Sequence, residues 1–382
     1  GVLVSGDGGT RRGMKELLDR GRLPNLKAVI DFGSLQVITI TDHDTMTKTS
    51  HTIMLTGLPP KTTGVIDNRR FKPIEAGWSM FERVQDALDG PQSISTVFVA
   101  SKVANVGGRG PEEAREWLRE KNKDRKDIPE GADETLKDQP GEPFFLTRNR
   151  LTVFDSGQRY SDTTGPLCLK YLTEHSEPRL LAFLHFADPD STGHRYGIDS
   201  TEHRDAIVDC DAWLGKIVQQ LRDSGEYDNT LLYVTTDHGF DEPDDEYEGK
   251  NHLNAPDCWL ATNDNHVTRG GKIADIPVTI MAHFGVMVDE LEPVVVGNPL
   301  GNGFAAHAYP RDPCTEPQVS EFFASLDTNG DFYIELAEVP ERRRERLERL
   351  FTRLDSNRDG KLDPIEFLTL EKRMAEREEK GE

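Results

Sequence analysis

The 382-residue chain lacks two features that would place it in well-defined classes of protein. It contains no run close to the ~20 apolar residues that a transmembrane helix requires, and charged residues are scattered throughout, so we expect no membrane span. It also lacks a positive balance of charge, because its formal net charge at pH 7 is −22. Nucleic acids and anionic lipid surfaces repel such a chain, and we expect neither as a partner.

Cysteine is scarce as well. The chain has four cysteines, Cys168, Cys210, Cys258 and Cys314, which permit three disulfide pairings or none. No CxxC spacing suggests a structural zinc site. The cysteines therefore do not indicate whether the protein resides in an oxidising or a reducing compartment. The chain also has no initiator methionine and starts inside an apolar run, GVLVSGD. We therefore expect that a segment such as a signal peptide precedes it.

What the chain does contain is an alternation of short apolar runs with longer helical patterns. The apolar runs lie at 1–6, 35–41, 94–100, 179–187 and 229–236, and the helical patterns include 14–23, 78–88 and 203–223. This order predicts the α/β class, with a mostly parallel sheet that helices cover on both faces.

Two segments depart from this alternation. The first, at about 111–150, is dense in charged residues, and we expect it to lie outside the sheet. The second begins after Pro293, where the sheet pattern fades through a Gly- and Pro-rich link. We therefore expect one α/β domain over residues 1–300 and a small, helix-dominated unit over residues 316–382.

Acidic residues follow three of the apolar runs directly. Asp7 follows the first, Asp188 and Asp190 follow the fourth together with His194, and Asp237 and His238 follow the fifth. A single Asp in such a place is often a helix cap, but three strand ends that deliver carboxylates and imidazoles to one edge of a sheet favour a shared site. Asp and His ligands together suit zinc, with manganese as the alternative.

The stretch TMTKTSHTIMLTG at 45–57 follows another apolar run and carries six hydroxyl side chains. It has two interpretations. It is the polar start of a helix, because Ser and Thr favour that position, or it holds a nucleophile at a helix N-terminus, where backbone N–H groups attract anions. A Thr hydroxyl needs activation at neutral pH, which a bound dication supplies by lowering its pKa.

Five motifs together resemble the alkaline phosphatase superfamily, and within it the nucleotide pyrophosphatase/phosphodiesterase-like branch. The resemblance covers residues 1 to about 290, through DGGTR at 7–11, TKTSHTIMLTG at 47–57, DNRR at 67–70, DPDSTGHRYG at 188–197 and TDHGF at 236–240. It implies an alkaline-phosphatase-like fold, two catalytic dications and Thr47 as the nucleophile.

The resemblance also implies the role of each site residue. One dication would take Asp7, Thr47, Asp237 and His238, and the other would take Asp190, His194 and a later His. For that last ligand we choose His252 over His307, because His252 follows the TDHGF loop and precedes an apparent strand, DCWLAT. Asn68 and the backbone N–H of Lys48 would bind a phosphoryl oxygen. The Lys48 side chain either binds substrate or is a solvated cation.

The expected reaction is hydrolysis of a phosphoric ester, at a phosphodiester or pyrophosphate bond, through a covalent phospho-threonine on Thr47. Two dications ~4 Å apart would neutralise the charge that develops. Sulfatases of the superfamily convert a Cys or Ser at the nucleophile position into formylglycine. Formylglycine cannot be made from Thr47, so we do not expect sulfate ester hydrolysis as the main activity. The remaining alternatives are a phosphomonoesterase, a phosphonate hydrolase, a phosphotransferase and an inactive calcium-binding protein.

The C-terminal unit contains two segments that match the EF-hand calcium loop. The loop at 355–366 fits at every diagnostic position, and its ligands would be Asp355, Asn357, Asp359, Lys361 through its carbonyl, Asp363 and Glu366. The ligands of the loop at 327–338 would be Asp327, Asn329, Asp331, Tyr333, Glu335 and Glu338.

The earlier loop carries Phe332 where glycine is expected, which costs ~1–2 kcal/mol and predicts weaker binding. Ile334 and Leu362 occupy the eighth positions of the two loops, where a short β contact would pair them. Permanent calcium binding suits millimolar calcium, so we expect a periplasmic or secreted protein.

Overall fold

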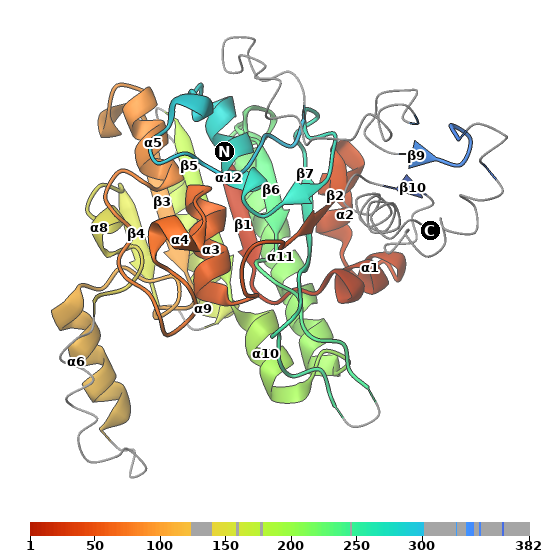
Figure 1. Ribbon diagram of the computed structural model, residues 1–382, viewed down its shortest axis with the longest axis horizontal. Helices are drawn as coiled ribbons and strands as arrows, with labels where there is room; N and C mark the ends of the chain where they lie inside the picture. The colour runs from red at the N-terminus through yellow and green to blue at the C-terminus, as the bar shows by residue number, and fades with distance from the viewer. Residues whose placement is uncertain are drawn as a thin grey trace, which may run out of the picture. The chain divides into compact units, whose positions relative to one another are not determined.

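Three predicted strands form the centre of the sheet in this computed structural model. β1 (Val2–Gly6) pairs in parallel with β5 (Leu180–Phe186) on one side and with β6 (Leu232–Thr235) on the other (Figure 1). The structure describes residues 1–123, 140–157, 160–175, 179–244, 247–301, 326, 334–339, 344 and 361–362. The central strands are buried on both faces, which explains why they read as continuous apolar runs.

The sheet has eight strands in the order β4-β3-β5-β1-β6-β7-β2-β8. The remaining five are β2 (Ser34–Thr39), β3 (Ser95–Ala100), β4 (Val153–Ser156), β7 (Asp257–Thr262) and β8 (Gly271–Lys272). β7 is antiparallel to both of its neighbours, β6 and β2, so β2 runs in the same direction as β1. The predicted fold class, a mostly parallel sheet between helices, is confirmed.

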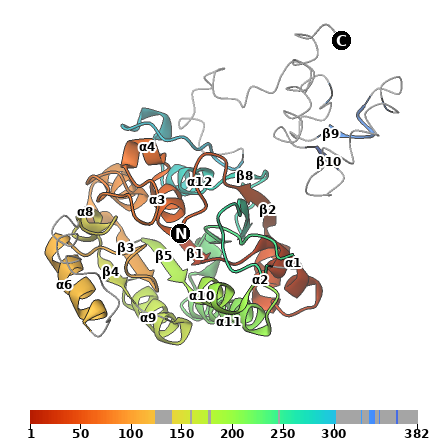
Figure 2. The ribbon, with the colours of Figure 1, turned by 60° about the horizontal axis from the view of Figure 1, so that its bottom comes forward.

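Helices cover both faces of the sheet, as Figure 2 shows. One layer packs around α11 and contains α1 (Arg11–Asp19), α2 (Pro24–Phe32), α9 (Ser161–Glu174) and α11 (Thr201–Asp223). The other contains α3 (Thr47–Thr56), α5 (Met80–Ala87) and α12 (Asp275–His283), which contact one another. Across the described residues, every helix is too short or too polar to cross a membrane.

The other helices connect these layers. They are α4 (Pro60–Thr63), α6 (Pro111–Asn122), α8 (Phe145–Arg148), α10 (Asp188–Tyr196) and the short 3₁₀ helices η1 (Pro91–Ser93), η2 (Tyr227–Asn229) and η3 (Val288–Glu290). The charged segment at 111–150 forms α6 and α8, and none of its described residues belongs to a strand.

Capping residues in the sequence mark where several of these helices begin or end. Ser79 and Glu82 form a reciprocal capping box at the start of α5, and the Ser200 hydroxyl accepts the N–H of His203 at the start of α11. Gly57 ends α3 with φ of 71°, a conformation that glycine adopts without strain. The helices predicted at 78–88 and 203–223 are confirmed as α5 and α11, whereas the helix predicted at 14–23 ends at Asp19, and α3 extends to Thr56.

The chain divides into two compact units, Gly1–Ala308 and Tyr309–Glu382. In the second unit β9 (Ile334–Glu335) pairs antiparallel with β10 (Lys361–Leu362), and Ile334 lies opposite Leu362. The predicted β contact between the two loops is therefore confirmed. Both side chains are buried.

Most of the predicted calcium ligands lie outside the described residues, namely Asp327, Asn329, Asp331, Tyr333, Asp355, Asn357, Asp359, Asp363 and Glu366. Of the rest, Glu338 accepts the backbone N–H of Glu335 through Oε2 at 2.9 Å, and Lys361 lies in β10. Cys314 also lies outside the described residues, and Cys168, Cys210 and Cys258 are free thiols.

Candidate active site

The carboxyl ends of β1, β5, β6 and β2 lie at one edge of the sheet, because these four strands share one direction. Asp7 follows β1, Asp190 lies in the first turn of α10, and Asp237 follows β6, and all three are buried. Asp188 has a different role, because its carboxylate accepts the N–H of Ser161, at 2.9 Å, where α9 begins. The predicted strand ends thus bring three carboxylates together and leave the fourth as a helix cap.

Hydrogen-bond partners distinguish Thr47 from the other five hydroxyl side chains of residues 45–57. Those of Thr45, Thr49, Thr52 and Thr56 donate to backbone carbonyls, and that of Ser50 bonds to His43. Thr47, the first residue of α3, instead faces the buried acids. Its Oγ1 lies 3.2 Å from Nε2 of His238 and 3.3 Å from Nζ of Lys102. Thr47 is therefore the hydroxyl that the fold presents to the group of acids and imidazoles.

Asp7, Asp237 and His238 form the first donor group. One ligand atom from each lies within 4.8 Å of the others. Nε2 of His238 is 3.3 Å from Oδ2 of Asp237 and 3.6 Å from Oδ1 of Asp7. With the Thr47 hydroxyl beside His238, the structure brings together the four residues that the resemblance assigns to one dication.

Asp190, His194 and His252 form the second donor group, again with ligand atoms within 4.8 Å of one another. Oδ1 of Asp190 is 3.3 Å from Nε2 of His194 and 3.7 Å from Nε2 of His252. Asp190 and His194 are one helical turn apart, which places them on the same face of α10. His307, the alternative to His252, lies outside the described residues.

Each of the three imidazoles is held by its other ring nitrogen. Nδ1 of His194, His238 and His252 bonds to a backbone carbonyl, at 2.7, 2.9 and 2.6 Å respectively. Because a carbonyl only accepts, Nδ1 carries the proton and Nε2 keeps its lone pair for a ligand. Burial lowers the pKa of His252 to about 4 and also lowers that of His238, so both rings are neutral at pH 7.

Three buried carboxylate oxygens in these groups accept no hydrogen bond. They are Oδ1 of Asp7, Oδ1 of Asp190 and Oδ2 of Asp237. A buried oxygen without a partner is costly, and a cation removes that cost. The unsatisfied oxygens and the oriented imidazoles fit two dications of the zinc or manganese type.

Lys102 is a member of the site that the sequence patterns did not predict. Its Nζ lies 2.9 Å from Oδ2 of Asp7 and 2.5 Å from Oδ2 of Asp190, so in both acids it contacts the oxygen that is not orphaned. Burial alone would lower the pKa of Lys102, but the charges of Asp190 and Asp7 outweigh it and raise the pKa. Lys102 comes two residues after β3, so the strand-end argument extended to this run would have found it.

The pKa of Asp237 is shifted in the opposite direction from those of Asp7 and Asp190. Burial and the charge of Asp7 raise the pKa of Asp237 to about 8. At Asp7 and Asp190 burial also acts to raise the pKa, but Lys102 and the neighbouring imidazoles together hold the pKa values below the usual range. Without dications Asp237 therefore holds a proton more tightly than an ordinary carboxyl group does. Metal binding at this carboxylate would release that proton.

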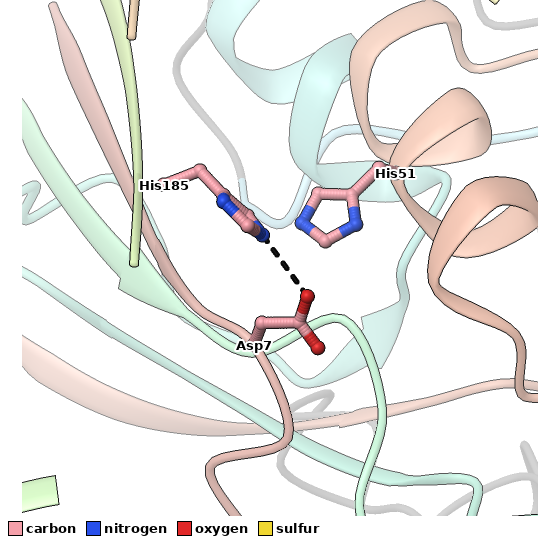
Figure 3. Close-up of side chains that lie close together, drawn as sticks. All are labelled: Asp7, His51 and His185. Carbon is pink, nitrogen blue, oxygen red and sulfur yellow. Dashed lines mark hydrogen bonds and ion pairs between the residues drawn. The ribbon is translucent and has the colours of Figure 1, made fainter. Parts of the chain in front are cut away.

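Two further imidazoles, those of His185 and His51, support the first donor group (Figure 3). Nδ1 of His185 accepts the backbone N–H of Ser101, so its Nε2–H donates to Oδ2 of Asp7 at 3.0 Å. His51 donates from Nδ1 to the carbonyl of Thr47 at 2.9 Å, one turn back in α3. Both rings are fully buried. These bonds orient Asp7 and the first turn of α3.

Asn68 and Lys48 contact each other beside Thr47. The backbone N–H of Lys48 donates to Oδ1 of Asn68 at 3.0 Å, so the two groups expected to bind a phosphoryl oxygen here bond to one another. The Lys48 ammonium donates to the carbonyl of Ala104 and lies 3.2 Å from the centre of the Phe71 ring. The alternative of a solvated lysine is wrong, because Lys48 is 2% exposed and burial lowers its pKa to about 7.

The fold and the site together define an α/β protein with a mostly parallel sheet, at one edge of which two Asp/His groups could hold metal ions. A sequence model of the type I phosphodiesterase/nucleotide pyrophosphatase family matches residues 2–315. The chain belongs to this family.

Two curated relatives match over shorter stretches. Rat ectonucleotide pyrophosphatase/phosphodiesterase family member 7 is 37% identical over 71 residues, which are 19% of this chain and 16% of the relative. Human bis(5′-adenosyl)-triphosphatase is 28% identical over 97 residues, which are 25% of this chain and 20% of the relative. The chain thus matches about a fifth of the length of these relatives.

A solved structure shares the fold over nearly its whole length. It is a murine ectonucleotide pyrophosphatase/phosphodiesterase 5 in an inactive form with AMP, at a TM-score of 0.51 and 12% identity. The similarity covers 79% of this chain and 96% of that one. This similarity supports the fold and leaves the substrate of the present chain to be argued from its own site.

Proposed function

We propose that the chain hydrolyses phosphoric esters, at phosphodiester or pyrophosphate bonds, through a covalent phospho-threonine on Thr47. The observation that carries this proposal is the position of the Thr47 hydroxyl. It lies beside His238, where two donor groups present buried carboxylate oxygens without hydrogen bonds. Asp7, Thr47, Asp237 and His238 would hold one zinc ion, and Asp190, His194 and His252 the other, with manganese as the alternative metal.

Each residue of the site would then have a defined role in the reaction. When bound, the two ions lower the pKa of the Thr47 hydroxyl and neutralise charge on the phosphoryl group. Thr47 Oγ1 attacks phosphorus, the bond to the leaving oxygen breaks, and water releases the phosphoryl group in a second step. Asn68 would turn its amide from the Lys48 N–H toward a phosphoryl oxygen, which frees that N–H for the same oxygen.

A phosphomonoesterase is the second candidate, and Lys102 is the observation that favours it. Its ammonium is 3.3 Å from the nucleophile, where it would pair with the second negative charge that a monoester carries and a diester lacks. If this contact governs specificity, Lys102→Ala will reduce hydrolysis of a monoester more than that of a diester.

The decisive experiment compares initial rates on bis-p-nitrophenyl phosphate and p-nitrophenyl phosphate for the zinc-loaded protein, with and without a chelator. Thr47→Ala should lose at least ~10³-fold of the rate and keep its zinc-binding acids and imidazoles. The matched control is Thr52→Val, because the Thr52 hydroxyl donates to the Lys48 carbonyl inside the same helix and takes no part in the site.

The outcomes separate the candidates. A diester preference lost both on chelation and in Thr47→Ala supports the phosphodiesterase, and a monoester preference supports the second candidate. An active Thr47→Ala overturns the nucleophile. Zinc-loaded protein that hydrolyses neither compound favours a phosphonate hydrolase, a phosphotransferase or an inactive calcium-binding protein.

For the unit at 316–382 we propose an EF-hand pair that holds calcium structurally. The antiparallel pairing of Ile334 with Leu362 supports it, because that contact joins the eighth positions of the two loops. A periplasmic or secreted location remains the accompanying proposal, since millimolar calcium would keep such loops filled.

A further inference from the structure

Another group of side chains that could bind a metal ion lies away from the candidate active site. It consists of Asp264, His266 and His283, which we call the β7-end cluster. Asp264 comes two residues after β7, and β7 runs antiparallel to β6. The end of β7 therefore lies at the opposite edge of the sheet from Asp7, Asp190 and Asp237. His283 is the last residue of α12 and reaches the cluster from the covering layer.

The two imidazoles face different oxygens of one carboxylate. Nδ1 of His266 is 3.0 Å from Oδ1 of Asp264, and Nε2 of His283 is 2.5 Å from Oδ2. Two other donors hold the carboxylate in this orientation. The hydroxyl of Tyr233 donates to Oδ2 at 2.8 Å, and the backbone N–H of His266 donates to Oδ1 at 2.9 Å.

The charge of Asp264 needs compensation. The residue is fully buried, and both ion pairs that the described part of the chain gives it are with imidazoles. Burial would raise the pKa of Asp264, but the hydrogen bonds from His283 and from the His266 backbone hold it below its usual value, so the carboxylate is ionised. The carboxylate and the two imidazoles each offer a ligand atom, and these three atoms lie within 4.8 Å of one another, close enough to bind a single cation.

We propose that the β7-end cluster binds a transition-metal dication of the zinc type, independently of the catalytic pair. The ligands would be one Asp264 oxygen, Nδ1 of His266 and Nε2 of His283, and metal binding would displace the proton through which Nε2 of His283 bonds to Asp264. The bonds from Tyr233 and the His266 backbone would remain and orient the carboxylate. The His266 side chain is 54% exposed, so the ion has a path from solvent and water completes its coordination.

The test is the zinc content of the full chain, measured by mass spectrometry after incubation with zinc and calcium and removal of free metal. His266→Ala should bind one zinc fewer per chain than the wild type, and His283→Gln should show the same loss. Both variants should hydrolyse p-nitrophenyl esters at the wild-type rate. The matched control is His175→Ala, a histidine outside both clusters, which should keep the full zinc content.

Two results would overturn the proposal. One is equal zinc content in the wild type and His266→Ala. The other is complete loss of zinc when Asp190 and His252 are replaced by Ala together with Asp237→Asn, because the β7-end cluster should still retain one ion. Since the readout is the difference in bound metal, it stands whether or not the proposed ester hydrolysis is correct.

Discussion

At Asp7 two contacts with the same oxygen decide which carboxylate oxygen is available to a cation. Nε2–H of His185 and the ammonium of Lys102 both contact Oδ2, and Oδ1 accepts no hydrogen bond. The tautomer of His185 is fixed in turn by the Ser101 N–H at its Nδ1. This chain of contacts orients Asp7 before any ion arrives.

Removing the bond from His185 should weaken zinc binding with little effect on the fold. His185→Leu keeps a buried side chain of similar size but no donor, so we expect zinc affinity at the first donor group to fall by ~10- to 100-fold. Competition with a chromogenic chelator measures it. His185→Gln, which restores an N–H near the position of Nε2, should recover part of the affinity, and a wild-type affinity in His185→Leu would contradict the role.

The sequence indicated the acids at the site better than the residues that support them. Asp7, Asp190 and Asp237 were predictable because they closely follow apolar strands. His185 was not, because it lies inside β5, a continuous apolar run in which a single buried histidine gives no sign of function. Asn68 was predicted through the resemblance, but its bond to the Lys48 N–H depends on the packing of a loop.

At the scale of elements, α10 positions two ligands of the second donor group by its packing against Phe240. Gly193, beside His194, has no room for a side chain, since a Cβ there would lie 2.6 Å from the Phe240 ring. Phe240 also contacts the rings of His194 and His252 edge-on. The close approach of α10 therefore sets the distance between Asp190 and the imidazoles.

Adding one methyl group at that contact should disturb the site. In Gly193→Ala either the ring or α10 must move, which costs ~1–3 kcal/mol when neither relaxes well, and a 1 Å shift of the ligands would lower kcat by ~100-fold. Activity and thermal unfolding measure the two effects. Ser191→Ala, an exposed site on the same helix, is the control and should change neither, and wild-type kcat in Gly193→Ala would show that the contact is not critical.

Other elements could not be predicted from local sequence. α9 contains Gly165 and Pro166, which disfavour a helix, yet it packs so closely on α11 that a Cβ at Gly165 would lie 2.2 Å from the Trp213 ring. Tertiary packing decides its conformation. β4 has only four residues and follows a charged segment, so no apolar run marks it in the sequence. The antiparallel direction of β7 depends on the strands with which it pairs and not on its own residues.

At the scale of the whole molecule, buried neutral imidazoles make stability depend on pH. His203 is fully buried, its Nδ1 bonds to the Pro189 carbonyl at 2.9 Å, and its Nε2 accepts no hydrogen bond. Burial lowers the pKa of His203 to about 4. In the unfolded chain the ordinary value is ~6.5.

The sign follows from which state takes up the proton. Between pH ~6.5 and ~4 the unfolded chain binds it and the folded chain does not, so the contribution of His203 to stability falls as pH falls through this window and is constant above it. His203 should contribute about 3 kcal/mol to that loss. Urea unfolding at pH 7 and pH 4.5 measures it. His203→Asn keeps a donor for Pro189 and should lose less stability, whereas an identical pH dependence would contradict the assignment.

Lys102 has a consequence for how the protein matures. Its ammonium already neutralises part of the charge that Asp7 and Asp190 bring into the interior, so the metal-free chain does not face the full repulsion between these acids. If the site takes two dications as proposed, the chain could therefore fold before it binds them. The choice of metal would then depend on the ions that surround the folded chain, because metal availability as well as ligand type sets selectivity.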